Sequence, residues 1–274
     1  MTDLSAAHAA AVTDRNRLVG SAYNGDRDLA ARQSLYRWQT PRYDLPGIVA
    51  GQLREVRGRG WVVDVGCGNG KFLRQLRRNR PDLTVLGLDI APGILAGVPG
   101  PLAVADADRL PLATASADAA LALHMLYHVP DIARAVGELS RVVTRDGLVV
   151  ASTNSDSDKA ELDDLWQRAA GDVLGIERGP ARISLSARFS LEKAPVFLEE
   201  VFGRVETIEL PGTITVRDPE PVIAHMSSYR AWADQHDVPF DATIERARAI
   251  LIDHIARNGA FEVNCLGGIL VCRR

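Results

Sequence analysis

Residues 61–73 read WVVDVGCGNGKFL, and this stretch decides the fold class. An apolar, β-branched run ends around Asp64, and glycine then occupies every second position, at Gly66, Gly68 and Gly70. Such a run before a glycine-rich turn, with a helical apolar pattern after it, predicts a buried strand, a tight loop and a helix. Glycine has no Cβ, so three glycines within five residues indicate that a ligand comes very close to this backbone.

Strand and helix patterns alternate along the chain after this loop. Apolar runs predict strands at 83–90, 101–108, 117–124 and 148–153. Asp131 can cap a helix that Gly147 ends, with Ile132, Val136, Leu139 and Val143 on one face. Strands that alternate with helices predict a parallel sheet covered by helices on both faces.

Composition excludes several classes of protein. The chain has 274 residues and a net charge of −3, which argues against a general nucleic-acid binder. No apolar run approaches the ~20 residues of a membrane span, and the start has no basic cap before an apolar block. We therefore expect a cytoplasmic protein. The three cysteines form no CxxC pair, and no metal site is predicted.

The spacing of the glycines separates the ligands that such a loop could hold. A phosphate-binding P-loop would need glycine at 65 and Ser or Thr at 72, where Val65 and Phe72 stand. The dinucleotide fingerprint would need a third glycine at 71 or 73, which are Lys71 and Leu73. Both alternatives fail.

Three acids remain around the bare backbone. Asp64 precedes the glycines, Asp89 closes the next strand, and Asp106 follows the third. A ligand that meets three acids should carry a positive charge, a diol and an exocyclic amine rather than several phosphates. S-adenosylmethionine has all three groups.

Four motifs in order resemble those of class I S-adenosylmethionine-dependent methyltransferases. They are VVDVGCGNGKFL, VLGLDIAPGIL, ADADRLPLATASADAALALHMLYHVPD and ELSRVVTRDGLVVAST, within about residues 60–155. The chain is most similar to the branch that includes ubiquinone and menaquinone biosynthesis enzymes and natural-product tailoring enzymes. The resemblance implies a Rossmann-like, seven-stranded, mostly parallel sheet with helices on both faces.

The resemblance also implies a role for each motif residue. Gly66, Gly68 and Gly70 let the backbone turn beneath the cofactor, where a Cβ would collide with it. Asp64 helps to hold the methionyl amino group, and Asp89 accepts hydrogen bonds from both ribose hydroxyls.

The remaining cofactor contacts come from the same motifs and the turns around them. Asp106 accepts from the adenine amino group, the Ala107 backbone N–H donates to the ring, and the His124 backbone touches the methionyl part. Cys67 and Ile90 adjoin the cofactor in the same motifs, and the Cys67 side chain is expected to fill space rather than react.

His128 is the candidate general base of the reaction. Methyl transfer needs a base only when the acceptor carries a proton of high pKa. The alternative role for His128 is a structural contact in a loop or at the start of a helix. His124 and His128 stand four residues apart, and they could share a metal only if one helix carried both.

The segments outside the motifs are divided by their patterns. We expect an N-terminal helical lid at 1–55, the cofactor-binding core at 56–208, a helical insertion forming a substrate lobe at 209–258, and a closing strand at 259–274. In the lid, Tyr23 could face the sulfonium through a cation–π contact or simply pack. Arg32 and Arg37 could pair with the methionyl carboxylate or be solvated. In the insertion, Met226, Tyr229 and Trp232 could line an apolar pocket or belong to the core.

These patterns predict a methyltransferase of the EC 2.1.1 type. It would transfer a methyl group from S-adenosyl-L-methionine to an O, N or C atom of a small molecule and release S-adenosyl-L-homocysteine. We expect the small molecule to be a specialised metabolite. Two alternatives stay open: an RNA methyltransferase acting on rRNA or tRNA, and a cofactor-binding module without catalysis. No membrane partner is expected.

Overall fold

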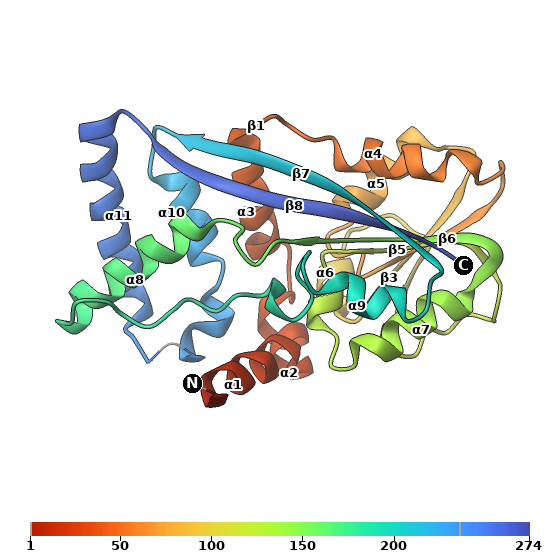
Figure 1. Ribbon diagram of the computed structural model, residues 1–274, viewed down its shortest axis with the longest axis horizontal. Coiled ribbons are helices and arrows are strands. Elements are labelled where there is room, and N and C mark those ends of the chain that lie inside the picture. The colour runs from red at the N-terminus through yellow and green to blue at the C-terminus, as the bar shows by residue number, and fades with distance from the viewer. Residues whose placement is uncertain (1, 236) are drawn as a thin grey trace. The chain divides into compact units, whose positions relative to one another are not determined.

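The structure, a computed structural model, describes residues 2–235 and 237–274 and separates into two compact units (Figure 1). Unit 1 consists of Met1–Arg42, Ser157–Ser184 and Pro211–Leu266, and unit 2 of Tyr43–Asp156, Leu185–Leu210 and Gly267–Arg274. The N-terminal part of unit 1 therefore ends at Arg42. The expected division of the chain after residues 55, 208 and 258 stays a prediction.

Eight strands form one sheet in the order β1–β7–β8–β6–β5–β2–β3–β4. Their bounds are β1 (Gln39–Thr40), β2 (Trp61–Val65), β3 (Thr84–Asp89), β4 (Leu102–Val104), β5 (Ala117–Leu123), β6 (Val143–Asn154), β7 (Arg204–Val216) and β8 (Phe261–Arg273). Strands β4, β3, β2, β5 and β6 pair in parallel, whereas β8 is antiparallel to β6 and β1 to β7. The expected seven-stranded, mostly parallel sheet is corrected to a mixed sheet of eight. Strand β1 was missed because two residues are too few to show a strand period.

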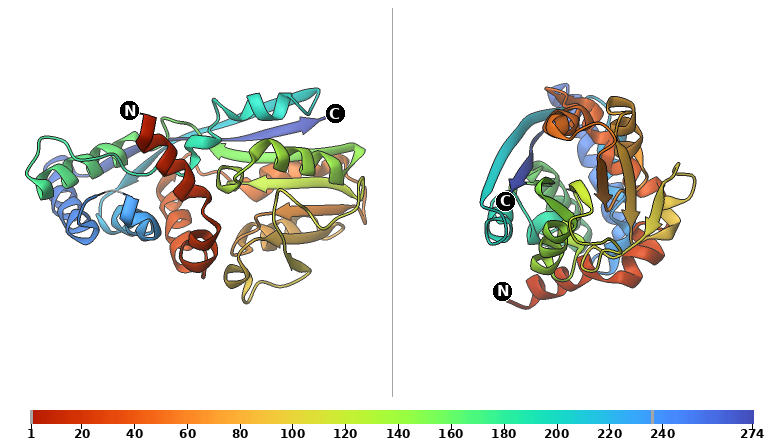
Figure 2. Two further views of the ribbon diagram at one scale, coloured as in Figure 1. Left: turned by 90° about the horizontal axis from the view of Figure 1, so that it is seen from below. Right: turned by 90° about the vertical axis from the view of Figure 1, so that its right-hand side faces the viewer.

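Unit 2 carries helices on both faces of its parallel strands. They are α4 (Leu45–Gln52), α5 (Lys71–Asn79), α6 (Pro92–Leu95), α7 (Ile132–Val142) and α9 (Ala194–Glu199), with short 3₁₀ turns at Leu53–Glu55, Leu126–His128 and Ser186–Arg188. Figures 1 and 2 show α4 and α5 on one side of these strands and α7 and α9 on the other. Val49 of α4 and Leu73 of α5 belong to one buried cluster with Val62 and Val85 of the sheet. Burying these apolar faces holds the strand ends in fixed register.

Helix α7 begins where the sequence predicted and ends earlier. The Asp131 carboxylate accepts a hydrogen bond from the Arg134 backbone N–H at 2.9 Å, which confirms the predicted N-cap. The helix ends at Val142, and β6 runs from Val143 through Gly147 instead of starting after it. A Cβ at Gly147 would lie 2.8 Å from the Asp118 carbonyl oxygen, so this glycine serves close strand packing rather than a helix end.

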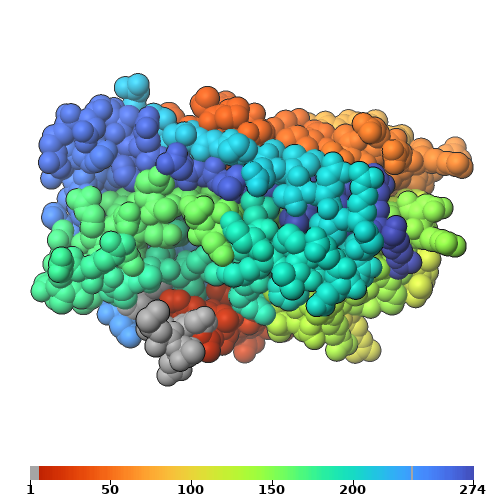
Figure 3. All heavy atoms as spheres, in the orientation of Figure 1, coloured from red at the N-terminus to blue at the C-terminus, as the bar shows by residue number. Residues whose placement is uncertain are grey.

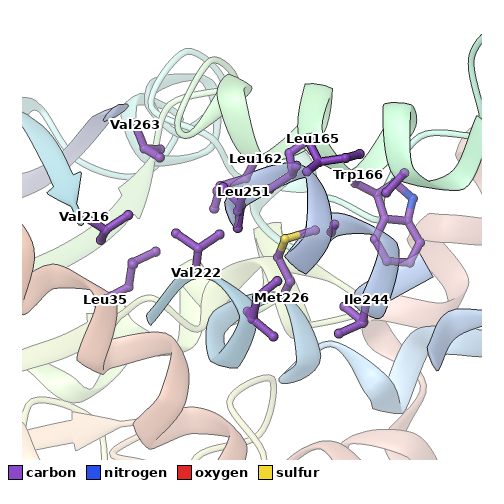
Figure 4. Close-up of a cluster of buried hydrophobic side chains, with 14 of the residues drawn as sticks. Leu35, Leu162, Leu165, Trp166, Val216, Val222, Met226, Ile244, Leu251 and Val263 are labelled. Atoms are coloured by element: carbon purple, nitrogen blue, oxygen red, sulfur yellow. The ribbon is translucent and has the colours of Figure 1, made fainter. Parts of the chain in front are cut away.

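Unit 1 is built mainly from helices. They are α1 (Thr2–Thr13), α2 (Arg15–Arg17), α3 (Arg27–Ser34), α8 (Ala160–Leu174), α10 (Glu220–Ser227) and α11 (Phe240–Asn258), with short helical turns at Leu18–Ala22, Leu35–Trp38 and Arg230–Gln235. Its core contains Leu35, Leu162, Trp166, Met226 and Leu251 (Figure 4). Helix α11 ends at Asn258, and the φ of 81° at Gly259 lets that glycine cap the helix in the left-handed region.

Two observations concern the outside of the protein. The segment from Leu185 to Leu210, which includes α9, lies at the surface of unit 2 (turquoise, Figure 3). In the parts of the chain that the structure describes, no helix combines the length and the apolar character needed to cross a membrane.

Candidate functional site

The glycine loop joins β2 to α5 with three left-handed residues. Gly66, Gly68 and Gly70 have φ angles of 73°, 53° and 65°, a region that side-chain-bearing residues rarely adopt. A Cβ would lie 2.7 Å from the Met125 Cβ at Gly66, and 2.3 Å from the Val98 Cγ1 at Gly70. At these two positions the protein itself therefore demands glycine, in addition to any demand by a ligand.

Asp89 ends β3 directly beside this loop. Its carboxylate accepts hydrogen bonds from the Gly68 backbone N–H at 2.8 Å and from the Ala91 backbone N–H at 3.0 Å. Burial raises the pKa of the Asp89 carboxyl, and the backbone donors at Ala91, Gly68 and Ile90 oppose that rise. The sequence placed Asp89 at the end of a strand, and the structure brings it to the middle glycine of the loop.

Asp64 lies in β2 and is almost fully enclosed. Its register partners are Gly87 of β3 and Leu121 of β5, and the residue is 2% exposed. Among the described residues, its Oδ2 has no hydrogen-bond partner. Burial, and then the charge of Asp89, raise the pKa of Asp64 to about 8. The two acids thus lie close enough for the charge of Asp89 to disfavour ionisation of Asp64, and neither forms an ion pair with a basic side chain among the described residues.

The turn after β4 carries the third acid. The Ala105 backbone N–H donates to the Asp89 carbonyl at 2.9 Å, which ties this turn to the end of β3. Asp106 is half-buried and its carbonyl accepts from the Arg109 backbone N–H at 3.2 Å, while Ala107 is buried. Ile90 is half-buried directly after β3. The structure therefore arranges Asp64, Asp89 and Asp106 along successive strand ends of one unit.

Cys67 lies inside the loop and fills space. It is buried, and a Cβ at Gly87 would come within 2.9 Å of its Sγ. Burial, together with the negative charges of Asp64 and Asp89, raises the pKa of the Cys67 thiol well above its ordinary value. The thiol is accordingly protonated at neutral pH.

The two histidines follow β5 on different local structures. His124 has a φ of 53°, and its backbone N–H donates to the Ser152 carbonyl at 3.0 Å. His128 ends a 3₁₀ turn, and its ring meets the edge of Tyr127 with centroids 4.7 Å apart. No single helix carries both histidines, so the helical condition for a shared metal is not met.

Arg188 supports this segment and was not recognised from the sequence. Its guanidinium donates to the carbonyls of Tyr127 at 3.1 Å, Val129 at 2.6 Å and Pro130 at 2.8 Å. These three bonds hold the chain on both sides of His128. An isolated arginine about sixty positions away gives no sequence signal for such a clamp.

Tyr23 and Arg32 belong to unit 1, whereas the motif residues belong to unit 2. The Arg32 Cζ lies 5.3 Å from the Tyr23 ring centroid. Arg32 is buried at 8% exposure, so the alternative that it is solvated is wrong. The role of Tyr23 toward a sulfonium stays a prediction.

The aromatic and sulfur-bearing side chains expected on the insertion lie mostly inside. Met226 is 1% exposed and belongs to the core of unit 1. Trp232 is 0% exposed, and its indole N–H donates to the Ala11 carbonyl at 3.1 Å. The core alternative is therefore correct for these two residues.

Comparison with known proteins finds similarity to methyltransferases over part of this chain. Residues 63–151 match the family model described as a methyltransferase domain. A malonyl-[acyl-carrier protein] O-methyltransferase of Serratia marcescens is 31% identical over 116 residues, which are 40% of this chain and 45% of that protein. A tRNA (carboxymethyluridine(34)-5-O)-methyltransferase of Arabidopsis thaliana is 28% identical over 160 residues, or 54% of this chain and 39% of that protein.

The similarity to curated relatives is thus partial, because the chain spans less than half the length of each of these two proteins. A crystal structure from Anabaena variabilis, of a proposed methyltransferase from an antibiotic biosynthesis pathway, has the same fold. It aligns with a TM-score of 0.59 at 18% identity and covers 83% of this chain and 96% of that one.

Proposed function

We propose that this chain is a class I S-adenosylmethionine-dependent methyltransferase and transfers a methyl group to an O, N or C atom of a small molecule, which the matches to methyltransferases support. One observation carries the proposal. The buried carboxyl of Asp64 and the half-buried carboxyl of Asp89 lie at adjacent strand ends around a left-handed glycine loop, and neither forms an ion pair among the described residues. This donor set fits a ligand with a positive charge and a diol, and it does not fit phosphates.

The residues of unit 2 divide the work of holding S-adenosylmethionine. Asp89 accepts from the ribose hydroxyls, and Asp64 faces the methionyl ammonium. Asp106 and the Ala107 N–H recognise adenine. The loop glycines, together with Cys67, Ile90 and the His124 backbone, form the wall. The cofactor, when bound, supplies an electrophilic methyl group on a sulfonium.

Because that methyl group is already activated, the main task of the protein is alignment. Holding an acceptor in line with the methyl removes about 7–11 kcal/mol of barrier in favourable cases. His128 is the residue that would accept an acceptor proton, and Arg188 is the positioning residue that holds its segment in place. Replacing His128 by Gln should lower kcat about 10²-fold or more if the acceptor needs a base. A loss of only a few-fold, measured with an identified acceptor, would remove His128 from this role.

A small acceptor is favoured over RNA by the charge of the chain. The net charge is −3, whereas binding to phosphate backbones requires a basic surface. The Serratia relative is named for O-methylation of malonyl-[acyl-carrier protein] and the Arabidopsis relative for methylation of tRNA. Among small molecules, we propose a specialised metabolite as the acceptor.

A methyl-transfer assay separates these acceptors. The protein is incubated with methyl-tritiated S-adenosylmethionine and, separately, with bulk tRNA, bulk rRNA, or panels of small phenols, amines and carboxylic acids. We expect label in a small-molecule panel, and none when Asp89 is replaced by Ala. Label confined to RNA would contradict the proposed acceptor class. Equal turnover by Asp89→Ala would contradict the proposed cofactor site.

A further inference from the structure

Three basic side chains are enclosed within unit 1, away from the motif residues in the sequence. Arg32 projects from α3 and is 8% exposed, and Lys159, just before α8, is 4% exposed. The Arg182 side chain, from the loop after α8, is likewise 8% exposed. Enclosed cations are expensive unless each finds a negative partner.

Two of the three cations have a carboxylate partner. Lys159 pairs with the buried Asp158 and donates to the Tyr36 hydroxyl at 2.8 Å. Arg182 pairs with Asp163 at 2.7 Å. Within each pair the carboxylate offsets the positive charge, so neither pair requires a charged ligand.

Arg32 has neutral partners only, within the described ranges. Its Nη1 donates to the Ser228 carbonyl at 2.9 Å. Its Cζ lies 5.3, 5.8 and 5.9 Å from the ring centroids of Tyr23, Tyr229 and Trp232. Cation–π contacts and one carbonyl do not neutralise a guanidinium, so the cluster keeps one positive charge in excess.

The unused donors of Arg32 and Arg182 belong to the same neighbourhood. The Arg182 Cζ lies 4.7 Å from the Tyr229 ring centroid, and the Arg32 Cζ lies 5.8 Å from the same centroid. The Nη2 of Arg32 and the Nη1 of Arg182 are buried and have no hydrogen-bond partner among the described residues. Unsatisfied buried N–H groups are rare in folded proteins and call for an explanation.

His225 reports the positive field of this cluster. Its ring centroid lies 5.6 Å from that of Tyr229. The pKa of His225 is well below 6.5, because burial and then the charges of Lys159, Arg182 and Arg32 disfavour the imidazolium. His225 is therefore neutral, and it leaves the excess positive charge unchanged.

We propose that Arg32 and Arg182 bind the carboxylate of a small organic acid other than the cofactor. One excess charge matches a monoanion, and free N–H donors on two guanidiniums match the two oxygens of a carboxylate. Tyr23, Tyr229 and Trp232 provide aromatic surface beside the charged group. This site lies within unit 1, and the inference does not depend on the proposed methyl transfer.

The probe for this site is benzoate, a monoanion with an aromatic ring, with benzamide as its neutral counterpart. Thermal unfolding and calorimetric titration are recorded at constant ionic strength. We expect benzoate to bind and to raise the Tm, and benzamide to do neither. Replacing Arg32 by Met should weaken benzoate binding at least about tenfold, because it removes a charge-assisted contact. The matched control is Arg246→Met, which removes an exposed arginine paired with Asp172 and should leave benzoate binding unchanged.

Stability without ligand distinguishes a binding role from a structural one. If Arg32 is kept for a ligand, Arg32→Met removes an unpaired buried cation, and the free protein should be as stable as the wild type or more so. A large fall in Tm, together with unchanged benzoate binding in Arg182→Met, would overturn the proposal. Should Arg32→Met fail to fold, Arg182→Met carries the same titration.

Two further arms test which anion the site takes. Inorganic phosphate should bind more weakly than benzoate, and the reverse order would overturn the assignment of a monoanionic carboxylate. S-adenosylhomocysteine should bind Arg32→Met as tightly as the wild type. Loss of its affinity, with no benzoate binding to the wild type, would assign Arg32 to the methionyl carboxylate instead.

Discussion

Asp64 is held in a state that disfavours its charge, and this has a consequence for stability. Its pKa in the folded protein is about 8, above the ordinary 3.8, because of burial and the nearby charge of Asp89. The folded state therefore binds a proton that the unfolded state releases between those two values. The stabilisation is fully present below about pH 4 and is lost as the pH rises through about 8.

At this residue we predict that Asp64→Asn raises the free energy of unfolding, and that the size of the increase depends on pH. The amide cannot ionise, so the free energy of unfolding at pH 8 should rise by roughly 2–5 kcal/mol, with little change at pH 4. Urea unfolding at the two pH values measures the gain. Asp146→Asn, at an exposed acid of the same unit, is the control and should change neither value. An equal effect of Asp64→Asn at both pH values would contradict the raised pKa.

Ligand binding should depend on the same proton. A cation next to Asp64 favours its ionised form, so S-adenosylhomocysteine, through its ammonium, should bind more tightly as the pH rises toward 8. Calorimetry in two buffers of different ionisation enthalpy should show proton release on binding at pH 7. Asp64→Asn should abolish that release. Proton uptake by the wild type would contradict the assignment of Asp64 to the ammonium.

At the scale of the element, the glycine loop combines left-handed backbone with close packing. Comparing Gly70 of the loop with Gly97, which lies outside it, separates the contributions of these two features to stability. Gly70 has a φ of 65° and would place a Cβ 2.3 Å from Val98. Gly97 has a φ of 77° and open space around it. Both substitutions to Ala place a Cβ on left-handed backbone, which is strained. Only Gly70→Ala also forces a clash with Val98.

We expect Gly97→Ala to lower the free energy of unfolding by about 1 kcal/mol and Gly70→Ala by about 3 kcal/mol. Urea unfolding of the two variants measures the difference. Equal losses would show that Val98 moves aside at no cost. A gain at Gly70 would contradict the loop geometry.

The Arg188 clamp gives a second prediction for this scale. Replacing Arg188 by Met keeps an apolar stem and removes the three hydrogen bonds to residues 127–130. Amide exchange at His128 and Val129 should become at least about tenfold faster, because local opening loses its main restraint. Lys193→Met removes another basic residue of the neighbouring segment and serves as control. Unchanged exchange in Arg188→Met would show that the clamp does not hold this segment.

At the scale of the whole molecule, features that depend on neighbouring residues could be predicted from the sequence. Contacts between residues far apart in the sequence could not. The strand–glycine–helix unit, the Asp131 cap and the acids at the strand ends follow from short-range patterns, because φ, period and capping are local properties. Strand β1 and the Arg188 clamp depend on partners far along the chain. The cations of unit 1 show the same limit. Arg32 comes from the N-terminal segment of unit 1, and Lys159 and Arg182 come from the segment Ser157–Ser184. Only the fold reveals that, among the described residues, Arg32 lacks a carboxylate partner.

The central claim is that the glycine loop with Asp89 holds S-adenosylmethionine, and a calorimetric titration tests it most directly. Purified protein is titrated with S-adenosylhomocysteine and, as a control, with NAD; Asp89→Ala and Asp146→Ala are titrated alongside. We predict binding of S-adenosylhomocysteine and none of NAD. Its affinity should fall at least about tenfold in Asp89→Ala and stay unchanged in Asp146→Ala. Equal affinity of folded Asp89→Ala and wild type would contradict the claim, as would preferential binding of NAD.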